Sequence, residues 1–144
     1  MPFCHIRLKG QRPLSRAYPK SLKTIGDHIR KRRLDLSLLQ REVAEIIGVD
    51  ETSVHNWEIN KALPMLRCLP AIIAFLGYNP LPEPTTIAEK LVQYRSIRGI
   101  HQDELAKRIG VDPATLARWE RGEREPSGKH LKQVEVLLAR ATSL

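Results

Sequence analysis

The sequence predicts an all-α protein made of two helical bundles in tandem. At 144 residues, the chain fits two modules of about 60 residues, each close to the lower size for a self-sufficient core. When the sequence is shifted by 62 residues, residues 25–76 align with residues 87–138 without a gap, and 14 of the 52 positions are identical. No segment has the alternating apolar pattern of a strand. We therefore expect modules in residues 21–77 and 85–144, joined by a proline-rich, extended linker in residues 78–84.

The first copy carries the start and stop signals of four helices. Thr24 and Ser37 are each followed three residues later by a side chain that can complete a capping box. Asp50 is a good cap for a third helix, and Pro70 suits the first turn of a fourth. Gly48 tolerates positive φ and ends the second helix. The expected helices cover residues 25–33, 38–47, 51–59 and 70–76.

The second copy repeats this plan. Thr86 opens its first helix in a capping box, and its second helix covers residues 102–109 and ends at Gly110. Asp112 caps the third helix, and Ser127 opens a longer last helix.

The second and third expected helices of each copy have the spacing of a helix-turn-helix. Two short helices that cross steeply need a small residue at the crossing, which Ala44 and Ala106 provide. The tight turn needs left-handed backbone geometry, which Gly48 and Gly110 provide. Two copies with identical spacing make a chance match improbable.

The stretches QREVAEIIGVDETSVHNWE and QDELAKRIGVDPATLARWERGEREPS resemble the Cro/C1-type (XRE family, lambda-repressor-like) helix-turn-helix. The resemblance covers roughly residues 21–77 and 84–141. It implies about five helices per copy, with the third entering the DNA major groove. It also implies an ion pair between the ends of the first and third helices, which here joins Arg33 to Glu58 and Arg95 to Glu120.

The resemblance also implies which residues contact DNA. Bases are contacted from the start and the sixth position of the third helix, here Glu51, Thr52, Ser53 and Asn56 in copy one and Ala114, Thr115 and Arg118 in copy two. Phosphates are contacted from the first residue of the second helix and from the loop after the third, here Gln40, Lys61, Gln102, Arg121, Arg124 and Lys129. In copy two, Arg118 is the best expected base reader, because a guanidinium can form bidentate bonds to guanine.

The net charge of +8 is concentrated at the N-terminus. Residues 1–20 form a basic arm without an acidic residue, whereas the two modules carry only +1 and +2. Its cations are Arg7, Lys9, Arg12, Arg16 and Lys20. Such an arm favours a polyanion such as nucleic acid, and the alternative is a solvated terminus.

Several other classes of protein are disfavoured. There is no glycine-rich phosphate loop and no nucleophile elbow, so we expect neither an enzyme nor a cofactor. Two cysteines, Cys4 and Cys68, supply no CxxC spacing for zinc, and the histidines show no ligand spacing, so we expect no metal. The longest apolar run is too short for a membrane span, and Met1 does not begin a signal peptide. We expect a cytoplasmic, nucleoid-associated protein.

Together these observations predict a transcriptional regulator, a repressor, that binds double-stranded DNA sequence-specifically through both copies. No membrane or small-molecule partner is implied. One alternative is an antitoxin or docking protein, in which one copy binds a protein partner or a second copy of the chain. Another is a DNA-binding subunit of a larger nucleoprotein complex.

Overall fold

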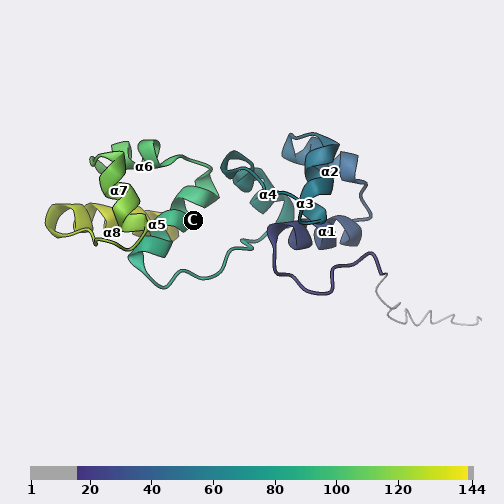
Figure 1. Ribbon diagram of the computed structural model, residues 1–144, viewed down its shortest axis with the longest axis horizontal. Helices are drawn as coiled ribbons and strands as arrows, with labels where there is room; N and C mark the ends of the chain where they lie inside the picture. Colours follow the sequence, from purple (N-terminus) through teal and green to yellow (C-terminus); the bar gives the residue numbers. More distant parts are fainter. Residues whose placement is uncertain (1–15, 143–144) are drawn as a thin grey trace, which may run out of the picture.

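The computed structural model describes residues 16–142, and within this range the chain forms helices and turns without a strand (Figure 1). This confirms the predicted all-α fold class. The helices of the first bundle are α1 (Ile25–Asp35), α2 (Gln40–Ile47), α3 (Glu51–Glu58), the 3₁₀ turn η1 (Leu66–Cys68) and α4 (Leu69–Leu76). Those of the second bundle are α5 (Ile87–Arg98), α6 (Gln102–Ile109), α7 (Pro113–Glu120) and α8 (Gly128–Thr142).

The number of helices differs slightly from the expected five per copy. The first bundle has five helical elements, which are four α-helices and the short 3₁₀ turn η1 that leads directly into α4. In the second bundle, one helix of 15 residues, α8, occupies the position of both η1 and α4. Pro70 in copy one corresponds to Lys132 in copy two, so the second copy lacks the proline that favours a new first turn.

Each bundle has its own aliphatic core. The first is built around Ile29, Val43, Val54 and Ile72, and the second around Leu91, Leu105, Leu116 and Val134, all of which are fully buried. Trp57 and Trp119 lie in these cores at 5% and 4% exposure. Their burial supports a packing role for both rings.

Most of the predicted helix starts are confirmed. Thr24 and Thr86 form complete capping boxes with Asp27 and Glu89. The predicted capping box at Ser37 is wrong: α2 begins after Leu39, whose backbone N–H donates to Glu42 Oε2 at 2.6 Å. The physical reason is that Ser37 adopts a left-handed turn, with φ of 56°, between α1 and α2.

Two glycines set the crossing of α2 on α3 and of α6 on α7. Gly48 and Gly110 both have φ of 83°, a conformation that glycine adopts without steric cost. A third glycine, Gly26, allows α1 to approach α3, because a Cβ at this position would lie 1.8 Å from the carbonyl oxygen of Trp57.

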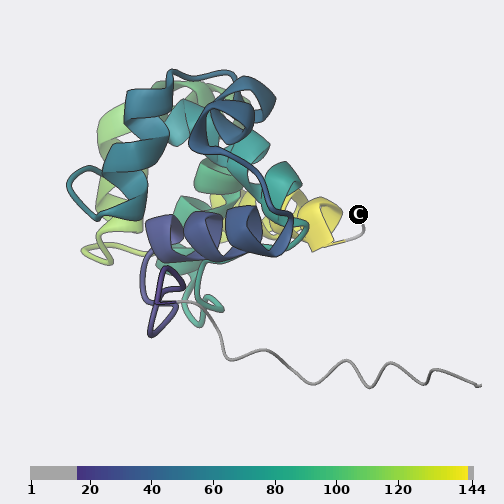
Figure 2. The same cartoon turned by 90° about the vertical axis from the view of Figure 1, so that its right-hand side faces the viewer.

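The two bundles contact each other, and the linker is bonded to both. Helix α4 and turn η1 pack against α5 (Figure 1), and a Cβ built on Gly99 would lie 3.1 Å from Pro70 Cδ and Cγ. The Tyr78 hydroxyl is 2.6 Å from His28 Nδ1 on α1, and Gln93 on α5 donates to the Pro82 carbonyl. In the view of Figure 2, the first bundle stands in front of the second. The linker therefore runs beside a direct contact between the bundles.

Candidate nucleic-acid interface

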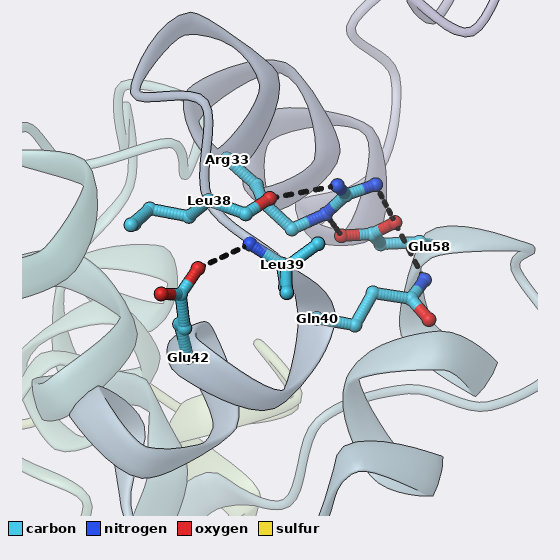
Figure 3. Close-up of polar contacts among 6 residues, drawn as sticks. All are labelled: Arg33, Leu38, Leu39, Gln40, Glu42 and Glu58. Carbon is cyan, nitrogen blue, oxygen red and sulfur yellow. Dashed lines mark hydrogen bonds and ion pairs between the residues drawn. The ribbon is translucent and has the colours of Figure 1, made fainter.

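A buried network joins three helices of the first bundle (Figure 3). Arg33 Nε donates to Glu58 Oε1 at 2.6 Å, and Nη2 donates to Oε2 at 2.8 Å. Gln40 Nε2 donates to the same Oε2 at 2.9 Å, and Arg33 Nη1 donates to the Leu38 carbonyl. The Glu58 side chain is only 2% exposed. Its hydrogen bond raises the pKa of Arg33 above its usual value, although burial opposes this.

The second bundle contains the same network. Arg95 Nε and Nη2 donate to the two carboxylate oxygens of Glu120 at 2.9 and 3.0 Å. Gln102 Nε2 donates to Glu120 Oε2 at 2.6 Å, and the Glu120 side chain is 4% exposed. In both copies the network therefore ties the start of the second helix to the ends of the first and third.

This network also orients the two glutamines that are expected to contact phosphates. An amide NH₂ has two donors, and the bond to the glutamate uses one of them. Within residues 16–142, the other N–H of Gln40, and likewise of Gln102, makes no hydrogen bond to the protein. A fixed amide with a remaining donor is suited to a phosphate oxygen.

The apolar side of α3 is buried, and its predicted base-contacting residues are accessible. Val54 and Trp57 lie in the core, Glu51 and Thr52 are exposed, and Ser53 and Asn56 are half-buried. Ser53 donates its backbone N–H and its hydroxyl to the capping carboxylate of Asp50, at 2.9 and 2.8 Å. The Ser53 hydroxyl is therefore left as an acceptor.

Helix α7 is arranged in the same way. Ala114 and Arg118 are exposed, and Thr115 is half-buried. The Thr115 hydroxyl donates to Asp112 Oδ2 at 2.5 Å, so its methyl group is the part left for a base. The hydrogen bonds from the Thr115 hydroxyl and backbone N–H lower the pKa of Asp112. The capping aspartate thus stays ionised and fixes the rotamer of a candidate base reader.

The predicted phosphate-contacting residues after the third helix are all exposed, but they differ in their partners. Lys61, Arg124 and Lys129 take part in no ion pair within residues 16–142. Arg121 pairs with Glu123 at 2.6 Å, so a phosphate would have to compete with that carboxylate. Exposed pairs of this kind contribute little to stability, and the competition is weak.

The basic arm lies mostly beyond the described part of the chain. Arg7, Lys9 and Arg12 fall outside the described residues, whereas Arg16 and Lys20 are described and exposed.

Sequence reasoning allowed a left-handed Asn60 in the loop after α3 but missed its side-chain contacts. Asn60 has φ of 58°, and its side chain accepts from Thr24 Oγ1 at 2.6 Å and donates to Asp27 Oδ1 at 3.2 Å. Copy two has Gly122, with φ of 73°, at the equivalent position. The signal in the sequence is that an asparagine replaces the glycine of the other copy at a left-handed position.

Comparison with protein families identifies the family to which the two copies belong. The family model described as Helix-turn-helix matches residues 29–81 and again residues 91–141. The chain belongs to the helix-turn-helix family. Each match contains one pair of crossed helices, α2 with α3 and α6 with α7, so the family applies to both copies. Searches of curated proteins and of solved structures found no match.

The chain is therefore a DNA-binding regulator of the Cro/C1 (XRE) type with two helix-turn-helix copies, and its partner is DNA. This is a regulatory family rather than an enzyme family. Within the described residues, no group of three or more histidine, cysteine or acidic side chains could hold a metal ion. None of the described helices is long and apolar enough to cross a membrane.

Proposed function

We propose that this protein is a sequence-specific repressor in which both helix-turn-helix copies read one continuous stretch of double-stranded DNA. One observation carries the proposal. In both copies the apolar residues of the third helix are buried, and the base-contact positions on that helix are exposed or half-buried. Each copy thus presents a usable recognition helix.

The side chains on these helices suggest the bases that they read. The Arg118 guanidinium matches guanine O6 and N7, and Asn56 matches adenine N6 and N7. Glu51 can accept from the amino group of cytosine. Ala114 and the Thr115 methyl group suit the methyl group of thymine, because the Thr115 hydroxyl is already bonded to the helix cap.

The remaining polar groups position the protein without reading sequence. Gln40 and Gln102 each have a donor to offer to a phosphate. The loop cations Lys61 and Arg124 are exposed, as is Lys129 at the start of α8. Phosphate contacts fix register and orientation but carry no sequence information. They would provide most of the salt-dependent affinity.

Repression would follow from occupancy of the operator. Because α4 packs against α5, the two recognition helices are held at a constrained separation, and a bound chain would cover two adjacent half-sites. DNA covered in this way is not available to polymerase.

Selection of bound duplexes from a random DNA library tests this proposal directly. The expected result is a motif with two different half-sites at a fixed spacing. Asn56→Ala should relax one half-site and Arg118→Ala the other, each at a cost of about 1–3 kcal/mol on the preferred sequence. Glu125→Ala, an exposed change outside the recognition helices, is the matched control. A motif with a single half-site, or no enrichment, would refute the two-copy repressor.

A second candidate function is favoured by the loop after α3. Three of its residues are large, apolar and exposed: Ile59, Leu63 and Met65. The corresponding residues of copy two are polar or charged: Arg121, Glu125 and Ser127. In this second function, copy two binds DNA and copy one binds a protein partner; an antitoxin is one example of such a protein. It predicts that Asn56→Ala leaves DNA affinity unchanged while Arg118→Ala lowers it, which is the opposite of the two-copy expectation for Asn56.

A further inference from the structure

A shallow groove of about 330 Å³ lies between α6 and α8 in the second bundle. Val136, which is 53% exposed, and Leu137 form its apolar part. Its polar lining consists of Arg108, Lys132, Gln133 and Arg140. Lys132, Val136 and Arg140 follow one another at intervals of four residues, so they share one face of α8. The groove therefore presents an apolar side chain between two cations.

This groove is separate from the hollow beside the recognition helix. That hollow is lined by Lys107, Val111 and Pro113 at the start of α7. Arg108 instead lines the groove with α8, and α8 packs against α5 and α6 (Figure 1). None of the residues that line the groove is a predicted DNA-contacting residue.

Two of the three cations have no ion-paired acid within residues 16–142. Arg108 donates to Glu104 at 2.7 Å in an exposed pair one helical turn apart. Lys132 and Arg140 take part in no ion pair within the described part of the chain. The groove therefore favours an anionic ligand.

The internal repeat shows that the same surface is used for a protein contact in the first bundle. Pro70 occupies the position of Lys132, and it packs against Gly99 of the second bundle. The groove cations that fall within the aligned repeat have uncharged equivalents in copy one: Ile46 corresponds to Arg108 and Pro70 to Lys132. This side of the last helix accepts a neighbouring domain in copy one, and in copy two it has become basic.

We propose that the groove between α6 and α8 docks an acidic segment of another protein. The segment would place an apolar side chain on Val136 and carboxylates against Lys132 and Arg140. A second copy of this chain fits less well, because the helix that would take the place of α5 is α1, where Arg30 and Arg32 take part in no ion pair among the described residues. DNA fits less well, since a phosphate backbone offers Val136 no apolar partner.

Binding of a short fluorescent peptide of glutamate and leucine to the full chain, measured by anisotropy, tests this proposal. A peptide with serine in place of every leucine and one with lysine in place of every glutamate are the peptide controls. The double variant Lys132→Glu with Arg140→Glu should weaken binding by about tenfold or more, because it places like charges opposite the ligand. Lys90→Glu with Lys107→Glu makes the same change in net charge outside the groove and should stay within about threefold of the unchanged chain.

Amide chemical shifts identify where each probe binds. The proposal expects the glutamate–leucine peptide to shift signals of α8 and the end of α6, the serine peptide to bind at least several-fold more weakly, and the lysine peptide not to bind. Equal loss in the two double variants would show non-specific attraction and overturn it. It would also be overturned if duplex DNA shifted the groove signals and the groove variant lost DNA affinity. A concentration-dependent dimer that Val136→Glu abolishes would instead assign the face to self-association and refute the proposal.

Discussion

Removal of the buried Glu120 carboxylate should unfold the second bundle and leave the first one folded. The Glu120 side chain is 4% exposed and accepts from Arg95 twice and from Gln102 once. Glu120→Ala leaves Arg95, whose side chain is only 16% exposed, without its counter-charge. Breaking a buried pair in this way costs about 3–5 kcal/mol.

This cost is comparable to the whole stability of a small bundle. At about 0.05–0.15 kcal/mol per residue, a module of about 60 residues has about 3–9 kcal/mol of unfolding free energy. The first bundle should survive, because its core contains no side chain from the second. The loss is therefore expected to be local, even though α4 packs against α5.

The two tryptophans provide a separate signal for each bundle. Trp57 and Trp119 are the only tryptophans of the chain, and each lies in one core. Their two indole N–H resonances, followed against temperature, should show the Trp119 signal lost at a lower temperature in Glu120→Ala, with Trp57 nearly unchanged. Glu125→Ala is the matched control on an exposed acid, and Glu58→Ala should give the mirror-image result. An unchanged Trp119 transition would refute the reasoning.

Three further predictions concern DNA contacts and acid stability. Arg118→Ala should change preference at one base pair, whereas Gln102→Ala should weaken binding to all sequences alike; competition with single-base variants distinguishes the two, and equal shifts for both mutants would contradict the assignment. Burial opposes ionisation of Asp27, but hydrogen bonds from the Asn60 side chain and from nearby backbone N–H groups outweigh it and lower its pKa. The first bundle should therefore lose stability as the pH falls below about 4, and Asp27→Asn should remove this part of the pH dependence of the melting temperature; identical acid profiles would count against it. Deletion of residues 1–15 removes three arm cations, and it should flatten the slope of log affinity against log salt by up to about 3, whereas an unchanged slope would make the arm a solvated terminus.

Local signals in the sequence were sufficient for most of the backbone. The capping boxes at Thr24 and Thr86 and the left-handed turns at Gly48 and Gly110 depend on residues three or four positions apart, so they could be predicted without knowledge of the packing. The prediction at Ser37 failed because the sequence offers two possible N-caps for α2, Ser37 and Leu39. Glu42 completes a box with the Leu39 backbone, and Ser37 takes a left-handed turn instead.

Contacts between distant segments could be predicted only in part. The Arg33 and Glu58 pairing followed from the family resemblance, but the donation from Gln40 to the same carboxylate did not. Likewise, Pro70 was expected to begin a helix, yet nothing local indicated that it would pack against Gly99. Such contacts depend on which helices pack together, and the residue pattern within one helix does not determine this.

The repeat separates positions that build the fold from positions that serve one copy only. The glycine turns, the capping aspartates and the Arg–Glu–Gln networks recur because both copies need the same helix crossing and the same junction of three helices. The outer surface of the last helix does not recur: it is uncharged at Pro70, where a domain packs against it, and basic at Lys132, where the described chain provides no such neighbour. A surface residue must suit whatever packs against it. A cation in place of a residue that packs against a domain therefore implies a different neighbour. For this reason the divergent surface positions, rather than the shared core, are where the individual function of each copy should be tested.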